Sequence, residues 1–155
     1  MFALGGAGTR AIFMYGMLEH LKTEPGFEDS IRSLKGAAGS SSGSMIALCL
    51  LVNANPTAIA EKLIEIGRDV ECVAPSMSMH DLIDSYGLDT GETLQNVIDH
   101  ILQTIGLTKN ITFAALHKLI SKEFVVCATN LHTREPTLFS AVTHGEMEIR
   151  DALYM

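Results

Sequence analysis

The sequence lacks the features that mark several classes of protein. It has only three cysteines, which stand far apart in apolar surroundings, at Cys49, Cys72 and Cys127. No Cys-x-x-Cys pair or Cys/His cluster is present, so the chain carries neither a disulfide framework nor the pattern of a metal site. We therefore expect buried thiols in a reducing compartment, the cytoplasm, and no metal or organic cofactor.

The chain also lacks a long apolar segment and an excess of basic residues. Its longest apolar run, residues 45–52, is much shorter than the roughly 20 residues that a helix needs to span a bilayer. The first six residues contain no basic segment and no long apolar segment, which excludes a secretory signal there. With 11 basic and 18 acidic residues, the formal net charge is −7. This balance argues against a nucleic-acid-binding protein.

What the chain does have is enough apolar surface for one compact domain. Apolar residues make up 47% of its 155 positions, which suffices for a sizeable core. We expect residues 1–155 to belong to a single domain. Because residues 151–155 read as the opening of a helix, we expect that the C-terminal portion of this domain is missing from the chain.

Apolar patterns predict short strands that alternate with longer helices. Buried strands are expected at residues 1–5, 36–39, 124–129 and 137–140. Helices are expected at residues 11–22, 45–52, 56–68, about 91–105 and 113–122, with a further short helix near 79–85. This order predicts an α/β domain with a largely parallel sheet, in which functional sites lie at the carboxyl ends of the strands.

The segment at residues 39–43, Gly-Ser-Ser-Ser-Gly, fits the pattern G-x-S-x-G. This pattern is typical of a strand-to-helix turn so tight that its central serine, here Ser41, has strained backbone angles. Glycines two residues before and after that serine let the strand and the helix approach closely. The hydroxyl is then exposed at a helix N-terminus, where the helix dipole favours negative charge. A flexible Gly/Ser loop is the alternative interpretation.

A second glycine-rich turn, residues 5–10, also lies between a predicted strand and a predicted helix. Such a turn exposes successive backbone N–H groups, which can bind the oxyanion of a tetrahedral intermediate. Because both turns follow strands of one sheet, we expect them to meet at its edge. Together they predict a serine nucleophile beside an oxyanion hole, formed by Gly5, Gly6, Ala7, Gly8 and Arg10.

The same turn fits the dinucleotide-binding pattern G-x-G-x-x-A over residues 6–11. That interpretation requires an acidic residue about 20 positions later, at the end of a second strand. Glu28 and Asp29 lie near that distance, but no strand is predicted before them. A nucleotide-binding α/β module is therefore the weakest of the alternatives.

Residues 3–21 resemble the opening of patatin-like phospholipases, and residues 36–44 resemble their nucleophile motif. Later stretches agree in the same order, at residues 112–116, 125–131 and 139–140. The resemblance implies a three-layer α/β/α fold and hydrolysis of lipid acyl esters by a serine–aspartate dyad without histidine. It assigns the nucleophile to Ser41 and the turn around it to Gly39, Ser42 and Gly43. It assigns the oxyanion loop to residues 5–10, where Ala7 replaces a third consecutive glycine.

The dyad aspartate is the part of the family pattern that this sequence does not match. In the family it stands in an Asp-Gly pair well after the strand that ends near Ser140, and the chain contains no such pair. Asp151 resembles a residue of the preceding helix instead. A serine hydroxyl without an adjacent base is a weak nucleophile. We therefore expect these 155 residues alone to be inactive or nearly so.

A histidine is the alternative base, as in a Ser-His-Asp triad. Of the six histidines, only His132 and His144 follow late predicted strands, and ordinary helix or loop positions are expected for all six. The resemblance implies a lipid or phospholipid as substrate and a peripheral place at membranes. A non-catalytic remnant that binds lipid or a partner protein is the alternative function.

Overall fold

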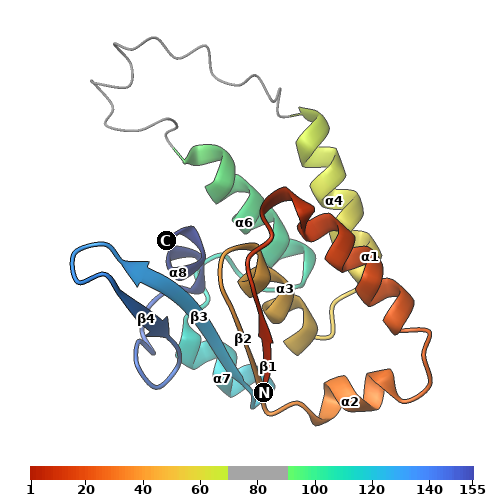
Figure 1. Cartoon of the computed structure of the whole chain (residues 1–155), viewed down its shortest axis with the longest axis horizontal. Helices are drawn as coiled ribbons and strands as arrows, with labels where there is room; N and C mark the ends of the chain where they lie inside the picture. The colour runs from red at the N-terminus through yellow and green to blue at the C-terminus, as the bar shows by residue number, and fades with distance from the viewer. Residues whose placement is uncertain (70–90) are drawn as a thin grey trace.

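The computed structural model describes residues 1–69 and 91–155 (Figure 1). Its strands form one sheet in the order β1 (Phe2–Leu4), β2 (Gly36–Gly39), β3 (Glu123–Asn130) and β4 (Glu135–Phe139). The first three strands are parallel, and β4 returns antiparallel to β3 through a short loop. The expected α/β class with a mostly parallel sheet is confirmed.

Helices fill the connections between the strands. They are the 3-10 helix η1 (Gly8–Arg10) and the α-helices α1 (Ala11–Leu21), α2 (Phe27–Ser33), α3 (Ser42–Leu51), α4 (Pro56–Asp69), α6 (Glu92–Thr104), α7 (Phe113–Ile120) and α8 (Ile149–Tyr154). The longer helices lie close to the predicted ranges. Helix α3 begins three residues earlier than expected, because the small residues before Met45 already have helical hydrogen bonds. The short helix expected near 79–85 lies outside the described residues.

Helix α2 is an element that the apolar pattern did not predict. It follows Gly26, which has a φ of 81° and so takes the left-handed conformation that glycine adopts most readily. Glu28 and Asp29 occupy its first turn, where carboxylates interact favourably with the helix dipole. These two residues therefore begin a helix and do not end a strand, which removes the support for the dinucleotide-binding interpretation.

The linking helices lie on one face of the sheet. The connections from β1 to β2 and from β2 to β3 each add the next strand further across the sheet in the same direction. Because parallel connections are right-handed crossovers, the helices of both then lie on the same face of the sheet. Helix α3 packs directly on the strands, and α1 and α4 lie side by side beyond it (Figure 1). On the opposite face, Ala38 and Val125 are half-buried and Leu138 is 53% exposed. No helical layer covers that face within the described residues.

Two apolar cores hold this arrangement together. One lies between the sheet and helices α3, α6, α7 and α8, where the rings of Phe113 and Phe124 stack with centroids 5.8 Å apart. The other lies on the far side of α3, against α1, α4 and α6. Helix α3 is therefore buried on almost every side, which fixes the position of its N-terminus at the sheet edge. Among the described helices, none is both long and apolar enough to cross a membrane.

Candidate functional site

Ser41 stands between the end of β2 and the start of α3. Its φ of 51° and ψ of −134° place a non-glycine residue in a sparsely populated backbone region. Such a conformation costs about 1–3 kcal/mol and persists only where the surrounding structure enforces it. The side chain is exposed, at the N-terminus of a ten-residue helix whose dipole favours negative charge nearby. These are the features that the sequence pattern predicted for this turn.

The two glycines that flank Ser41 are required by close backbone contacts. A Cβ built on Gly39 would lie 2.4 Å from the Cα and N atoms of Ser44, in the first turn of α3. A Cβ built on Gly43 would lie 2.4 Å from the carbonyl oxygen of Gly5. Gly39 therefore lets the strand meet the helix, and Gly43 lets the helix meet the loop that follows β1.

The glycine-rich loop lies directly against Ser41, as expected. A Cβ built on Gly6 would be 3.0 Å from the Cβ of Ser41 and 3.6 Å from its Oγ. Gly8 has a φ of 55°, a left-handed conformation that favours glycine. Within the described residues, no protein group accepts a hydrogen bond from the backbone N–H of Gly6 or Gly8. Of the two glycines, Gly6 is the one that contacts Ser41 directly.

The other members of the predicted oxyanion loop have different roles in the geometry. The N–H of Ala7 donates a 2.9 Å hydrogen bond to the Oγ of Ser42, so this donor is already occupied. The N–H of Arg10 donates to the carbonyl of Ala7 at 3.1 Å and closes the short helix η1, while the Arg10 side chain is exposed. These bonds brace the loop from within and attach it to the first turn of α3.

Ser44 is a supporting residue that the sequence pattern did not single out. It is fully buried, and its hydroxyl and its N–H both donate to the carbonyl oxygen of Ser41. On the other side of the turn, the N–H of Ser40 donates to the carbonyl of Leu4 at 3.2 Å. The strained peptide at Ser41 is thus held by hydrogen bonds from both α3 and β1. The signal that could have found Ser44 is a small hydroxyl residue three positions after the turn serine.

Two cavities open beside Ser41. The larger, of about 860 Å³, lies toward the ends of β3 and β4 and helix α8, and its polar lining includes Thr129, Asn130 and Thr137. The smaller, of about 450 Å³, lies between α1, α3, α4 and α6, and its lining is mostly apolar. Ser41 lines both. Its hydroxyl therefore stands where two volumes of ligand size meet.

No partner for Ser41 with the chemistry of a base is found around it in the described part of the chain. Neither cavity is lined there by an aspartate, a glutamate or a histidine. His132 is exposed in the loop between β3 and β4, and His144 packs against Phe139 with ring centroids 4.7 Å apart. Asp151 is exposed in α8 and lines neither cavity. Among the described residues, no cluster of side chains could hold a metal ion.

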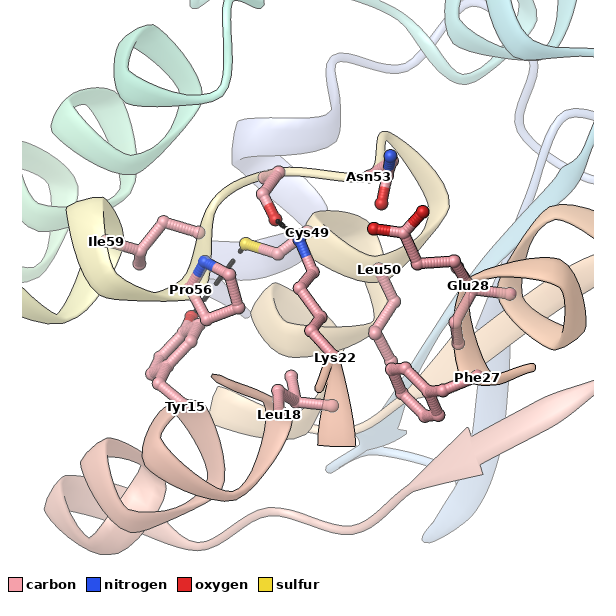
Figure 2. Close-up of a pocket in the computed structure, with 12 residues that line it drawn as sticks. Tyr15, Leu18, Lys22, Phe27, Glu28, Cys49, Leu50, Asn53, Pro56 and Ile59 are labelled. Carbon is pink, nitrogen blue, oxygen red and sulfur yellow. Dashed lines mark hydrogen bonds between the residues drawn. The ribbon is translucent and has the colours of Figure 1, made fainter. Parts of the chain in front are cut away.

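A third and much smaller pocket, of about 10 Å³, is not lined by Ser41 (Figure 2). It lies between α1, α2, α3 and α4, and at its base the Tyr15 hydroxyl is 3.9 Å from the Sγ of Cys49. At its rim, the Nζ of Lys22 donates to the carbonyl of Ala54 at 2.8 Å. Burial raises the pKa of the Cys49 thiol to about 12 and raises the pKa of Tyr15 as well. Both groups are therefore neutral, and the pocket holds no more than a water-sized molecule.

Comparisons with known proteins indicate the family to which this chain belongs. The family model described as Patatin-like phospholipase matches residues 2–155. The chain is also similar to a protein of Acanthamoeba polyphaga mimivirus, "Uncharacterized protein R571", with 26% identity over 155 residues that cover 99% of this chain and 49% of that protein. The chain thus spans about half the length of this curated relative. No solved structure matches it. Because the family model covers almost every residue, the chain belongs to the patatin-like phospholipase family.

Proposed function

We propose that this chain carries the nucleophile and the oxyanion hole of a lipid acyl-ester hydrolase. The observation that carries the proposal is the strained Ser41, whose Oγ lies against the main chain of Gly6. A nucleophile exposed on a rigid turn and facing unpaired N–H donors is the arrangement that acyl transfer requires. Family membership supports lipid esters as the substrate class.

In the proposed reaction, the Ser41 oxygen attacks the ester carbonyl and forms a tetrahedral intermediate. The N–H groups of Gly6 and Gly8 donate to its oxyanion, and the N-terminal end of α3 adds a favourable dipole. Collapse of the intermediate releases the alcohol and leaves an acyl-enzyme, which water then hydrolyses. Loss of one oxyanion donor typically reduces the rate by about 100- to 1000-fold.

The base that activates Ser41 is the part of this reaction that we assign outside the 155 residues. A serine–aspartate dyad is what the resemblance to the family implies, and no carboxylate lines the cavities beside Ser41 among the described residues. We propose that the aspartate belongs to a further segment of the domain. The mimivirus relative, which is about twice as long, is consistent with such a segment.

A fluorophosphonate probe tests the proposal, because it forms a covalent bond only with an activated serine. We expect labelling at Ser41 in a protein that includes the further segment, and no labelling of the Ser41→Ala variant. Ser33→Ala is the matched control, because Ser33 is exposed in α2 and its hydroxyl only donates to the carbonyl of Ser30. Labelling that survives in Ser41→Ala would disprove the assignment. With a p-nitrophenyl ester, the 155 residues alone should show little or no turnover.

A non-catalytic remnant that binds lipid is the second candidate function. The observation that favours it is the absence of a carboxylate or imidazole from the described lining of both cavities. Under this alternative, the longer protein binds lipid but Ser41 stays unlabelled by the fluorophosphonate probe. The same experiment therefore separates the two candidates.

A further inference from the structure

The smaller cavity beside Ser41 has a markedly apolar wall. It is formed by four helices, and its side chains include Ala11 and Ile12 of α1, Met45 of α3, Leu63 of α4, and Val97 and Ile101 of α6. The polar side chains on its described lining are those of Ser41, which precedes α3, of Ser42, which begins it, and of Tyr15. The cavity is therefore polar at the Ser41 end and apolar elsewhere.

The Tyr15 hydroxyl does not make the interior of this cavity polar. Figure 2 shows the hydroxyl directed toward Cys49, with which it forms a 3.9 Å hydrogen bond on the side of the third pocket. Tyr15 is only 2% exposed, so the surface that it offers to the cavity is its ring. The far end of the cavity thus offers hydrocarbon contacts and no charge.

The larger cavity differs in this respect. Apolar side chains such as Leu131 and Phe139 line it too, but Thr129, Asn130 and Thr137 add polar groups at the ends of β3 and β4. Hydroxyl and amide groups can donate and accept hydrogen bonds, so this side suits a polar group. An ester bound at Ser41 has an apolar acyl chain and a more polar alcohol part. The smaller cavity suits the acyl chain, and the larger cavity suits the alcohol part.

We propose that the acyl chain of the ester lies in the cavity between α1, α3, α4 and α6, with its carbonyl carbon at Ser41. This inference rests on the proposed function, since it assigns the two arms of that substrate. Val97 and Leu63, which are half-buried on opposite helices of the cavity, then set the length of chain that fits. Each methylene buried there strengthens binding about fourfold until the cavity is full.

The test uses binding of unbranched fatty acids of four to twelve carbons to the full-length protein, measured by isothermal titration calorimetry. We expect the affinity to rise about fourfold per methylene in the wild type and to reach a plateau at shorter chains in Val97→Phe. Dodecanoate should bind Val97→Phe at least tenfold more weakly than it binds the wild type, while the affinity for hexanoate should change little. Val142→Phe is the matched control, because Val142 is 86% exposed and lines neither cavity.

The outcomes separate this inference from the proposed function. Ser41→Ala should keep the chain-length dependence, because binding does not require the nucleophile. If Val97→Phe binds every acid like Val142→Phe, or if affinity does not rise with chain length, the assignment of the cavity is wrong even when Ser41 reacts with the fluorophosphonate. If Ser41 does not react with the fluorophosphonate but affinity still rises with chain length, the assignment of the cavity stands and the proposed hydrolysis is wrong. Should Val97→Phe lose its cooperative unfolding transition, Leu63→Phe narrows the same cavity from α4 and must show the same plateau.

Discussion

The backbone of Gly43 touches the backbone of Gly5: a Cβ built on Gly43 would lie 2.4 Å from the Gly5 carbonyl oxygen and 2.6 Å from that of Leu4. These oxygens belong to β1 and the loop after it, and Gly43 belongs to the first turn of α3. Non-bonded heavy atoms attract each other best at about 3.5–4.0 Å, so a side chain cannot fit there. The loop after β1 and the first turn of α3, which together form the candidate site, can therefore contact each other because residue 43 is a glycine.

Gly43→Ala should separate those segments. The added methyl group meets backbone atoms, which cannot rotate away, so we expect a loss of about 1–3 kcal/mol in unfolding free energy. We also expect slower fluorophosphonate labelling of Ser41, because the loop with Gly6 must move. Urea unfolding and labelling rates measure the two effects. Gly16→Ala in α1 is the control: outside the backbone of its own helix, no atom lies within 4 Å of a Cβ built there, and helix propensity should make this variant about 1 kcal/mol more stable.

Ser42→Ala should loosen the glycine-rich loop without adding bulk. The variant removes the acceptor of the 2.9 Å hydrogen bond from the Ala7 N–H. A bond of about 1 kcal/mol corresponds to roughly fivefold faster hydrogen exchange at the Ala7 amide, which NMR can measure. Labelling of Ser41 should slow as well, because the Gly6 and Gly8 donors are no longer held in place. Unchanged exchange at Ala7 would contradict this role, and Ser33→Ala should leave that amide unaffected.

The turn at Ser41 could be predicted from sequence because its requirements are local. Glycines at positions 39 and 43 lie within two residues of the serine, and the strand and helix on either side have clear apolar patterns. The bond between Ser42 and Ala7 could not be predicted, since it joins residues 35 positions apart. The glycine spacing identifies Ser41 as the exposed serine, but nothing in the sequence indicates that Ser42 turns toward the loop.

The cavities and helix α2 could not be predicted from the sequence pattern either. The apolar cavity depends on how α1, α3, α4 and α6 pack, which periodicity within each helix does not determine. Helix α2 has seven residues, too few for its apolar spacing to stand out, and its one buried residue is Ile31.

Stability should fall at high pH in a way that depends on Cys49. Burial raises the pKa of this thiol from 9.0 to about 12, so the folded protein keeps a proton that the unfolded chain loses above pH 9. The stabilisation is complete below pH 9 and is lost as the pH rises toward 12, by about 1.4 kcal/mol per pH unit. Unfolding free energies between pH 9 and 11 should therefore fall less steeply in Cys49→Ala than in the wild type.

The control for this pH dependence is Leu50→Ala, which truncates a buried neighbour on α3 without removing a titratable group. It should lower the unfolding free energy at every pH and keep the wild-type slope. If Cys49→Ala and the wild type have the same slope, the thiol is not held neutral by burial.

The ion pair between Asp99 and Arg150 should stabilise the fold more than the distance between its charged atoms suggests. Asp99 Oδ2 lies 3.6 Å from Arg150 Nη1, joining α6 to α8, and each side chain is only about a quarter exposed. The other carboxylate oxygen of Asp99 is buried with no hydrogen-bond partner in the described residues. Arg150→Met leaves this carboxylate unpaired, so we expect a loss of about 1–2 kcal/mol, between the values for exposed and buried pairs.

A double-mutant cycle with Asp99→Asn measures the pair itself, because the double variant removes both charges and should cost less than the sum of the two single changes. The pair of Lys62 and Glu65 in α4 is the matched comparison. Its atoms are closer, at 2.9 Å, but Glu65 is 60% exposed, so water and salt screen the attraction. Lys62→Met should therefore cost less than about 0.5 kcal/mol. A coupling energy larger for the α4 pair than for Asp99 and Arg150 would mean that separation, and not burial, decides the strength of ion pairs in this domain.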